Sequence, residues 1–518
     1  MRLMANEHNG FKGRYWTNPK VIADVLKEFC SNSTIHGVRY FTERRRHWTE
    51  RCFWFIAIGL SFWYCLVSIQ DMWIKWRACP VSMSFNEKDA PISAIPFPTV
   101  TICPETKAFK NKFEINPVYD SLMESNPWKL SNQQWVQLEA LSHLCRFNFP
   151  EYVRYGNKFT NTSIYDIIQD IAPNLTSVIV SCSWNLQMEN CESHFSPTIT
   201  DEGLCFTFNA LNSDEIYTDA MAPEMMIVKN SPNVSHWSLE NGYPPGCNQR
   251  GYPIRVFNVK HSVSLTIFLQ LFGQDIEYRC RGLIPGFKLF LHVPGEVQPA
   301  SRHSFRVPLS EAVQISIIPK FIVTSDKLLS YKPQERQCFY NFERQLLFFK
   351  MYTQNNCELE CLANFTRIEC GCVKFSMPRT RRTHICGVSS IQCYQSAERK
   401  LYGDSDGSNN DTAKAFREMC QCLPSCTYVK YSADIDRAKL NWVESQISNR
   451  FHFHEMFGTQ PSNLEIYFRD HEVTTMMRSE MYTTTNFIAN CGGLLGLFLG
   501  ISMLSIIEFI YYSTLRLY

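Results

Sequence analysis

Two long apolar segments, one near each end of the chain, constrain its fold more than any other feature. The first, Cys52–Trp73, carries no charged residue before Asp71. The second, Asn486–Tyr512, carries a single charged side chain, Glu508. Each is long enough to cross the roughly 30 Å hydrocarbon core of a bilayer as a helix. We therefore expect a membrane protein with two transmembrane helices.

Basic residues set the expected orientation of these helices. Arg44, Arg45, Arg46 and Arg51 lie directly before the first segment, and basic flanks favour the cytoplasmic side. A buried core helix, the alternative for this segment, does not explain such a flank. No secretory signal peptide precedes it, so the segment itself is expected to direct export. The predicted regions are a cytoplasmic N-terminus (1–51), helix 52–73, an extracellular domain (74–485), helix 486–512 and a short cytoplasmic tail (513–518).

Cysteine usage indicates that the region 74–485 lies in an oxidising compartment. Eighteen of the 22 cysteines fall between Cys79 and Cys426, and a reducing cytosol would leave so many as reactive thiols. In such a compartment, the cysteines of the C-x-C pairs are expected to form disulfides rather than to bind a metal. The same region carries five N-glycosylation sequons, at Asn161, Asn174, Asn233, Asn364 and Asn410.

Composition excludes other classes of function. A net charge of +2 provides no concentrated basic surface, so nucleic acid is not an expected partner. The chain shows no catalytic constellation, phosphate-binding loop or zinc-protease motif. We therefore predict no enzymatic activity, no cofactor and no metal.

Periodicity predicts a mixed α and β extracellular domain. Alternating apolar residues predict four strands, in His261–Gln270, Phe287–Val293, Val313–Ile317 and Leu464–Phe468. Phe339–Cys361 and Asp411–Cys420 are predicted to be helical. Because cysteines cluster from Cys357 to Cys426, these helices are expected to be joined by disulfides. The predicted fold class is an α+β membrane protein with two transmembrane helices and a large disulfide-rich extracellular domain.

Several motifs, in order along nearly the whole chain, resemble the degenerin, epithelial sodium channel and acid-sensing ion channel superfamily, most closely its insect pickpocket branch. These motifs are STIHG (33–37), RHWTER (46–51), PFPTVTICPE (96–105), GLCFTFN (203–209), the cysteine run 357–426 and NCGGLLGLFLGISMLSIIEF (490–509). The resemblance implies a hand-like subunit, with a β-core palm and a helical thumb on a two-helix stem. It also implies a homo- or heterotrimer in the plasma membrane that conducts sodium ions, is insensitive to voltage, and is blocked by amiloride-type compounds. Sensory or epithelial sodium entry is the role that such channels serve.

The resemblance places a selectivity filter at Gly500, Ile501 and Ser502. A dehydrated cation needs oxygen ligands, and Gly500 would allow extended backbone inside the span, exposing carbonyl groups. Ser502 would add a hydroxyl oxygen, and Ser505, one turn further, is expected to matter less. The alternative is a small-residue packing face. Glu508 is expected to form a ring of carboxylates at the inner mouth, rather than merely to reach the membrane interface.

The resemblance also implies gating roles for His36 and Gly37, and for Ala489 and Asn490. Small residues allow helices to close together, so a bulky residue at Ala489 should wedge the gate open. Acid-sensing relatives carry aspartate where this chain has Asn490, so an outer carboxylate ring is absent here. That difference makes the affinity of an amiloride-type blocker harder to predict.

The family pattern further implies seven disulfides, which are Cys103–Cys205, Cys182–Cys191, Cys338–Cys426, Cys357–Cys422, Cys361–Cys420, Cys370–Cys393 and Cys372–Cys386. Three pairings stay open for Cys79, Cys145, Cys247 and Cys280. The remaining four cysteines, Cys30, Cys52, Cys65 and Cys491, are expected to stay unpaired.

Two alternatives and one processing site remain open. A purinergic-type two-span trimer would need a lysine-rich nucleotide site and another cysteine order. A membrane-anchored adhesion or accessory receptor that does not conduct would have no need of Gly492-Gly493, Gly-x-Ser and Glu508 in one span. Arg379–Arg382 fits a furin-type cleavage pattern, although such runs are more often solvated loops.

Overall fold

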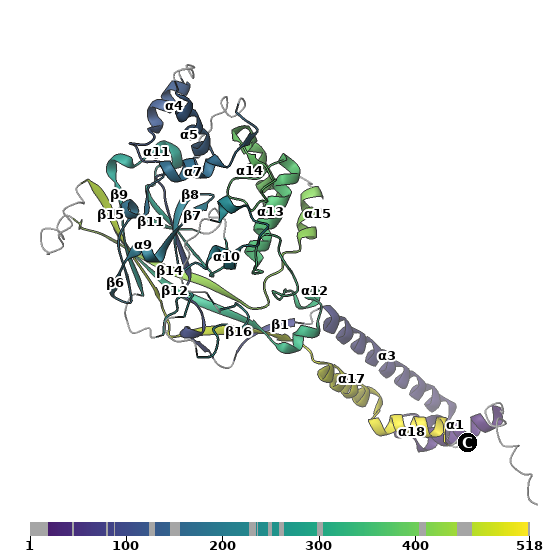
Figure 1. The fold of residues 1–518 in the computed structure, drawn as a ribbon. Helices are drawn as coiled ribbons and strands as arrows, with labels where there is room; N and C mark the ends of the chain where they lie inside the picture. The colour runs from purple at the N-terminus through teal and green to yellow at the C-terminus, as the bar shows by residue number, and fades with distance from the viewer. Residues whose placement is uncertain are drawn as a thin grey trace, which may run out of the picture. The chain divides into compact units, whose positions relative to one another are not determined.

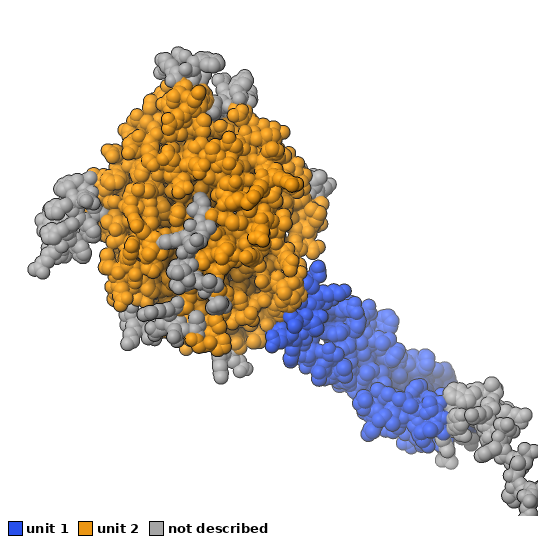
Figure 2. Space-filling view, in the orientation of Figure 1, with its two compact units in different colours: residues 1–83, 325–336, 478–518 blue, residues 84–324, 337–477 orange. Residues whose placement is uncertain are grey.

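The structure is a computed structural model in which two compact units are resolved (Figure 2). Unit 1 comprises residues 1–83, 325–336 and 478–518, and unit 2 comprises residues 84–324 and 337–477. Both units are therefore assembled from segments far apart in sequence. The described residues are 19–43, 46–78, 81–86, 89–123, 130–145, 156–226, 235, 237–246, 251–257, 264–297, 304–402, 411–442 and 458–515.

Unit 1 is helical. Its elements are α1 (Pro19–Asn32), α2 (Arg39–Thr42), α3 (Trp48–Ala78), η5 (Asp326–Ser330), α12 (Pro333–Arg336), α17 (Thr484–Leu499) and α18 (Met503–Ser513). Near the end of α3, the Trp76 ring stacks on Phe487 of α17 with centroids 5.0 Å apart, and its Nε1 donates to the Tyr482 carbonyl. The predicted segments 52–73 and 486–512 thus fall within α3 and within the pair α17 and α18.

A large sheet forms the centre of unit 2 (Figure 1). Among the described residues its nine strands are β1 (Val81–Phe85), β2 (Ala90–Pro91), β5 (Ile179–Trp184), β6 (Gln187–Glu189), β9 (Leu265–Phe272), β12 (Glu311–Thr324), β14 (Tyr428–Lys439), β15 (Thr459–Phe468) and β16 (Glu472–Glu480). From β16 the order is β16-β12-β15-β9-β5-β6, with β14 also paired to β12. Every second residue of β9, starting at Leu265, is buried, as expected for a strand with one face on the core.

A second sheet of five strands has the order β11-β10-β3-β8-β7. These strands are β3 (Thr99–Pro104), β7 (Phe195–Thr200), β8 (Gly203–Phe208), β10 (Gly286–His292) and β11 (Phe305–Pro308). Two further short strands, β4 (Phe159–Thr160) and β13 (Ile385–Cys386), pair with each other. One cluster of buried apolar side chains joins the two larger sheets, with Phe97, Phe206 and Phe468 at its centre.

Helices cover the sheets of unit 2. They are α4 (Ile115–Met123), α5 (Asn132–Ser142), α7 (Ser163–Ile171), α8 (Leu175–Val178), α9 (Cys191–His194), α10 (Ser213–Ile216), α11 (Tyr278–Arg281), α13 (Gln354–Cys370), α14 (Ile391–Tyr402) and α15 (Asp411–Cys420). Short 3₁₀ helices lie at η1 (Ile92–Ala94), η3 (Pro223–Met225), η4 (Gly273–Asp275) and η6 (Val388–Ser390). Of these, α13, α14 and α15 pack together as a lobe (Figure 1). The mixed α and β content agrees with the predicted fold class.

The prediction of a helix over Phe339–Cys361 was wrong in its first half. Helix α13 begins only at Gln354, after Thr353, whose hydroxyl accepts a hydrogen bond from the Asn356 amide. Before it, the Phe339 amide donates to the Pro424 carbonyl, and the Cys426 amide donates to the Phe339 carbonyl. These long-range bonds, beside the Cys338–Cys426 disulfide, use the backbone groups that a helix would need.

Eight disulfides lie among the described residues, all in unit 2. Seven join the same pairs that the family resemblance implies: Cys103–Cys205, Cys182–Cys191, Cys338–Cys426, Cys357–Cys422, Cys361–Cys420, Cys370–Cys393 and Cys372–Cys386. The eighth, Cys145–Cys280, resolves part of the open pairing and links the turn after α5 to α11. Cys79 and Cys247 lie outside the described residues, and Cys30, Cys52, Cys65 and Cys491 are free thiols.

The predicted glycosylation and cleavage sites differ in how far they are exposed to solvent. Asn161 and Asn174 are exposed, Asn364 on α13 is half-buried, and Asn233 and Asn410 lie outside the described residues. Arg379, which a furin-type protease would have to bind, is 2% exposed and its guanidinium donates to Glu224. Cleavage after Arg382 therefore does not fit the folded domain, because the first arginine of the motif is not available.

Candidate functional site

Two apolar elements of unit 1 meet the length and composition of membrane spans. Helix α3 passes from Trp48 to Arg77 as one continuous span, and almost none of its side chains are buried. The second element is α17 followed by α18, which together are apolar enough to cross but are bent by 74° at a break of a few residues. The break falls on Gly500, Ile501 and Ser502, the residues predicted to form a filter.

Gly500 ends α17 in a left-handed conformation, with φ 65° and ψ 20°. Its amide donates to the Gly496 carbonyl, which is the bond of the αL helix cap that glycine permits, and the Ile501 amide donates to the Leu495 carbonyl. The expectation of extended backbone at Gly500 was therefore wrong. The extended residue is Ser502, with φ −106° and ψ 172°.

Ser502 begins α18 through a reciprocal cap with Ser505. The Ser505 amide donates to the Ser502 hydroxyl at 3.3 Å, and the Ser502 amide donates to the Ser505 hydroxyl oxygen at 3.1 Å. This pairing satisfies two of the amides that a helix start leaves unpaired. Ser505 thus holds the break together with Ser502.

The break is rich in acceptors and poor in donors. The amides of Gly500, Ile501 and Ser502 are all used in hydrogen bonds within the second span. Within the described part of the chain, by contrast, the carbonyls of Gly500 and Ile501 accept no backbone hydrogen bond. Carbonyl oxygens without a donor are the groups that replace the water around a dehydrated cation.

The His-Gly motif contacts this break directly. The His36 amide donates to the carbonyl of Leu499 at 3.1 Å. A Cβ placed on Gly500 would overlap His36 Nδ1, so the imidazole ring occupies the space of a side chain there. Gly37, with φ 87°, lies against α3, where a Cβ would come within 2.8 Å of Ile58 Cδ1. The fold therefore brings His36 and Gly37 to the predicted filter.

A hydroxyl relay connects the same loop to Glu508. The Thr34 hydroxyl lies 2.7 Å from the Ser505 hydroxyl and donates to Glu508 Oε2 at 3.1 Å. The Ser505 side chain is buried, at 2% exposed, and Glu508 is half-buried. Sequence reasoning missed Thr34 and expected Ser505 to matter less than Ser502. Two sequence features could have indicated these roles: Thr34 lies two residues before His36, and Ser502 and Ser505 have the S-x-x-S spacing of a helix cap.

Ala489 and Asn490 do not join this cluster. They lie on α17 more than two turns before the break, and both are exposed in the single chain. Gly492 and Gly493 follow them, and a Cβ at either would meet nothing within 4 Å. Positions 489, 492, 493 and 496 share one side of a helix. That side is lined by alanine and glycine and is uncovered in one copy of the chain.

Comparison with known proteins matches residues 29–512 to the family described as the amiloride-sensitive sodium channel. The chain belongs to this family. The match covers the two apolar elements and the region between them together, and it confirms the resemblance to the degenerin, epithelial sodium channel and acid-sensing channel superfamily. Members of the amiloride-sensitive sodium channel family are membrane ion channels and not enzymes.

Individual relatives place the chain near the insect branch of the family. It is 27% identical to pickpocket protein 28 of Drosophila melanogaster over 501 residues, which cover 95% of this chain and 78% of that protein. Pickpocket protein 11 of the same fly is 22% identical over 495 residues, covering 94% and 75%. Acid-sensing ion channel 4-B of Danio rerio is 22% identical over 494 residues, also covering 94% and 75%.

Proposed function

We propose that the chain is one subunit of a trimeric, voltage-insensitive, sodium-preferring cation channel of the plasma membrane. The observation that carries this proposal is the break at Gly500–Ser502, where all three amides donate within α17 and α18 while the Gly500 and Ile501 carbonyls accept no backbone hydrogen bond among the described residues. A transmembrane anchor needs no such break, because an unbroken helix satisfies all its backbone groups. Both termini are then cytoplasmic, and residues 74–485 are extracellular.

The proposed pore combines three copies of this break around a threefold axis. Three sets of carbonyl groups and Ser502 hydroxyls would form a narrow ring of oxygens that selects among cations. Three Glu508 carboxylates would lie further along α18, where they attract cations to the inner mouth. The uncovered side of α17, from Ala489 to Gly496, supports assembly, since small residues let helices approach closely in a membrane.

The proposal is tested by the current that the chain carries, alone or with related subunits. Under bi-ionic sodium and potassium conditions, we expect a reversal potential that shows sodium preference and block by an amiloride-type compound. Replacing Ser502 with Leu should change both conductance and the reversal potential, because the closely packed ring cannot accommodate a larger side chain without moving the backbone. Leu497→Ala, at a side chain that is 79% exposed on α17, is the matched control and should keep the wild-type reversal potential.

Two results would count against the assignment. If Ser502→Leu reaches the surface and conducts with unchanged selectivity, the filter lies elsewhere. If the chain reaches the surface but adds no current in any subunit combination, it is a non-conducting accessory or adhesion subunit, which is the alternative function.

A further inference from the structure

A large cavity lies inside unit 2. Its volume is about 540 Å³, within the range of roughly 300–1,000 Å³ that small-molecule sites occupy. Strands β3, β7, β8 and β10 of the five-stranded sheet form one wall, and α10 and α13 contribute to the opposite wall. Nothing in the proposed conduction mechanism uses this cavity.

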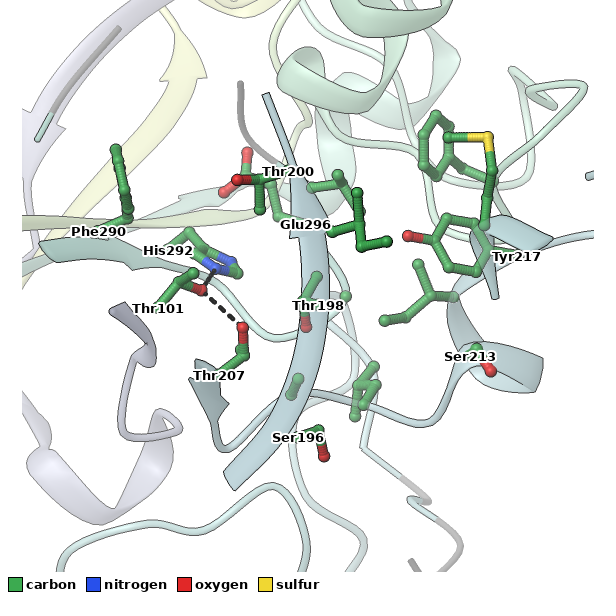
Figure 3. A pocket seen from close by; sticks show the side chains of 18 of the residues that line it. Thr101, Ser196, Thr198, Thr200, Thr207, Ser213, Tyr217, Phe290, His292 and Glu296 are labelled. Carbon is green, nitrogen blue, oxygen red and sulfur yellow. Dashed lines mark hydrogen bonds between the residues drawn. The ribbon is translucent and has the colours of Figure 1, made fainter. Parts of the chain in front are cut away.

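The sheet wall is lined by hydroxyl groups. Ser196, Thr198 and Thr200 alternate along β7 and all line the cavity (Figure 3), since every second residue of a strand faces the same side. Thr200 is hydrogen-bonded to the Gly203 carbonyl. Within the described residues, the hydroxyls of Ser196 and Thr198 have no partner. Hydroxyls that line a cavity and have no protein partner can hydrogen-bond a ligand or water there.

A fixed relay of hydrogen bonds completes this wall. The Thr101 hydroxyl lies 3.1 Å from both the Thr207 hydroxyl and His292 Nε2, and His292 Nδ1 lies 3.3 Å from the Val293 carbonyl (Figure 3). Because a carbonyl only accepts, Nδ1 carries the proton and Nε2 accepts from Thr101. Burial lowers the pKa of His292 to about 4, so the ring is neutral and adds no positive charge to the wall.

The opposite wall carries an apolar cluster together with the side chains of Ser213 and Tyr217 (Figure 3). Ile216, Met221, Phe349 and Leu359 form a buried cluster that lines the cavity. Tyr217 extends from the same wall, and its hydroxyl points into the open space (Figure 3). That hydroxyl has no hydrogen-bond partner among the described residues, and burial raises its pKa to about 12, so it remains a neutral donor.

Charge at the cavity is unbalanced. Asp201, Glu296 and Glu398 line it, against a single cationic side chain, Lys374. A ligand that carries a positive charge is therefore favoured over one that carries a carboxylate. The apolar wall requires that the rest of the ligand be an aromatic or aliphatic body.

We propose that this cavity binds an amphipathic organic amine. Its apolar body lies against Met221 and Phe349, and its ammonium group faces the hydroxyls of β7 and the acidic residues around them. The Tyr217 hydroxyl offers a further hydrogen bond to a polar group on the body. All residues that line the site belong to unit 2 of a single subunit, so its occupation can be measured without any current.

The test uses purified full-length protein in detergent and three matched probes: 2-phenylethylamine, 2-phenylethanol and 3-phenylpropionic acid. Binding is followed by isothermal titration and by saturation-transfer NMR. We expect the amine to bind at least tenfold more tightly than the acid and more tightly than the alcohol. Thr198→Val and Tyr217→Phe each remove one hydroxyl without changing shape, and should weaken amine binding by roughly three- to tenfold. Met221→Trp should fill the cavity and abolish binding.

Tyr467→Phe on β15, which lies outside the cavity, is the control and should bind the amine like the wild type. Melting temperatures of all variants show whether the fold is intact. Equal binding of the three probes, or no binding of the amine, would overturn the proposal. So would full amine affinity in a folded Met221→Trp variant, because the amine would then be bound elsewhere.

Discussion

Gly500 is the position at the break where a side chain has least room. Its φ of 65° costs a residue with a β-carbon about 1 kcal/mol, and the His36 ring stands where that carbon would be. We predict that Gly500→Ala displaces the His-Gly loop and lowers whole-cell current several-fold at equal surface expression. Current normalised to surface biotinylation measures this effect.

A second variant separates the two causes at Gly500. In the double variant His36→Ala with Gly500→Ala, the clash is gone and only the backbone cost remains, so part of the current should return. Gly59→Ala in α3, where a Cβ meets nothing within 4 Å, should behave like the wild type. A Gly500→Ala channel with wild-type current would mean that the contact with His36 plays no part in the open state.

At the scale of elements, two disulfides join α13 to the last residue of α15 and to the segment that follows it. Cys357 and Cys361, one turn apart on the helix, bond to Cys422 and Cys420. The Cys361–Cys420 bond closes a separation of 59 residues, whereas Cys182–Cys191 closes 9. The loop entropy of the unfolded chain then predicts that the free energy of unfolding falls by about 4 kcal/mol when Cys361 and Cys420 are replaced by serines. For Cys182 and Cys191 the expected fall is about 2.5 kcal/mol.

The measurement for this prediction is thermal unfolding of the full-length protein under non-reducing conditions. The Cys361→Ser/Cys420→Ser variant should melt at a lower temperature than Cys182→Ser/Cys191→Ser, which serves as the matched control. The opposite ranking would show that the helical lobe is held chiefly by its apolar contacts. Peptide mapping without reduction checks each bond, including Cys145–Cys280.

At the scale of the whole molecule, one chain leaves the side of α17 that carries Ala489 uncovered. In the proposed trimer, three copies of this side meet, and a bulky residue would keep them apart. We therefore predict that Ala489→Phe gives continuous inward current, recorded without any stimulus. Ile488→Phe is the control, because Ile488 is also exposed but faces another side of the helix. Resting current in Ala489→Phe equal to the wild type, with normal surface expression, would contradict the proposed packing.

The sequence by itself determined the local features of this protein. A long segment without charged residues predicted α3, and the alternation of apolar and polar residues predicted β9, β10, β12 and β15. The family resemblance of the cysteine pattern implied seven of the eight disulfides found among the described residues. These features depend on neighbouring residues or on a motif with a fixed order. The same reasoning failed at Phe339–Thr353, where the chain forms long-range bonds to residues near Cys426 in place of a helix.

Only the tertiary structure decided which distant residues share a site. Sequence order gives no sign that Thr34 reaches Glu508, that His36 fills the space beside Gly500, or that Cys145 pairs with Cys280. The cavity near Thr198 and Tyr217 is likewise built from segments that local patterns do not connect. The physical reason is that such contacts depend on how packed elements bring separate parts of the chain together, which no local period or propensity records.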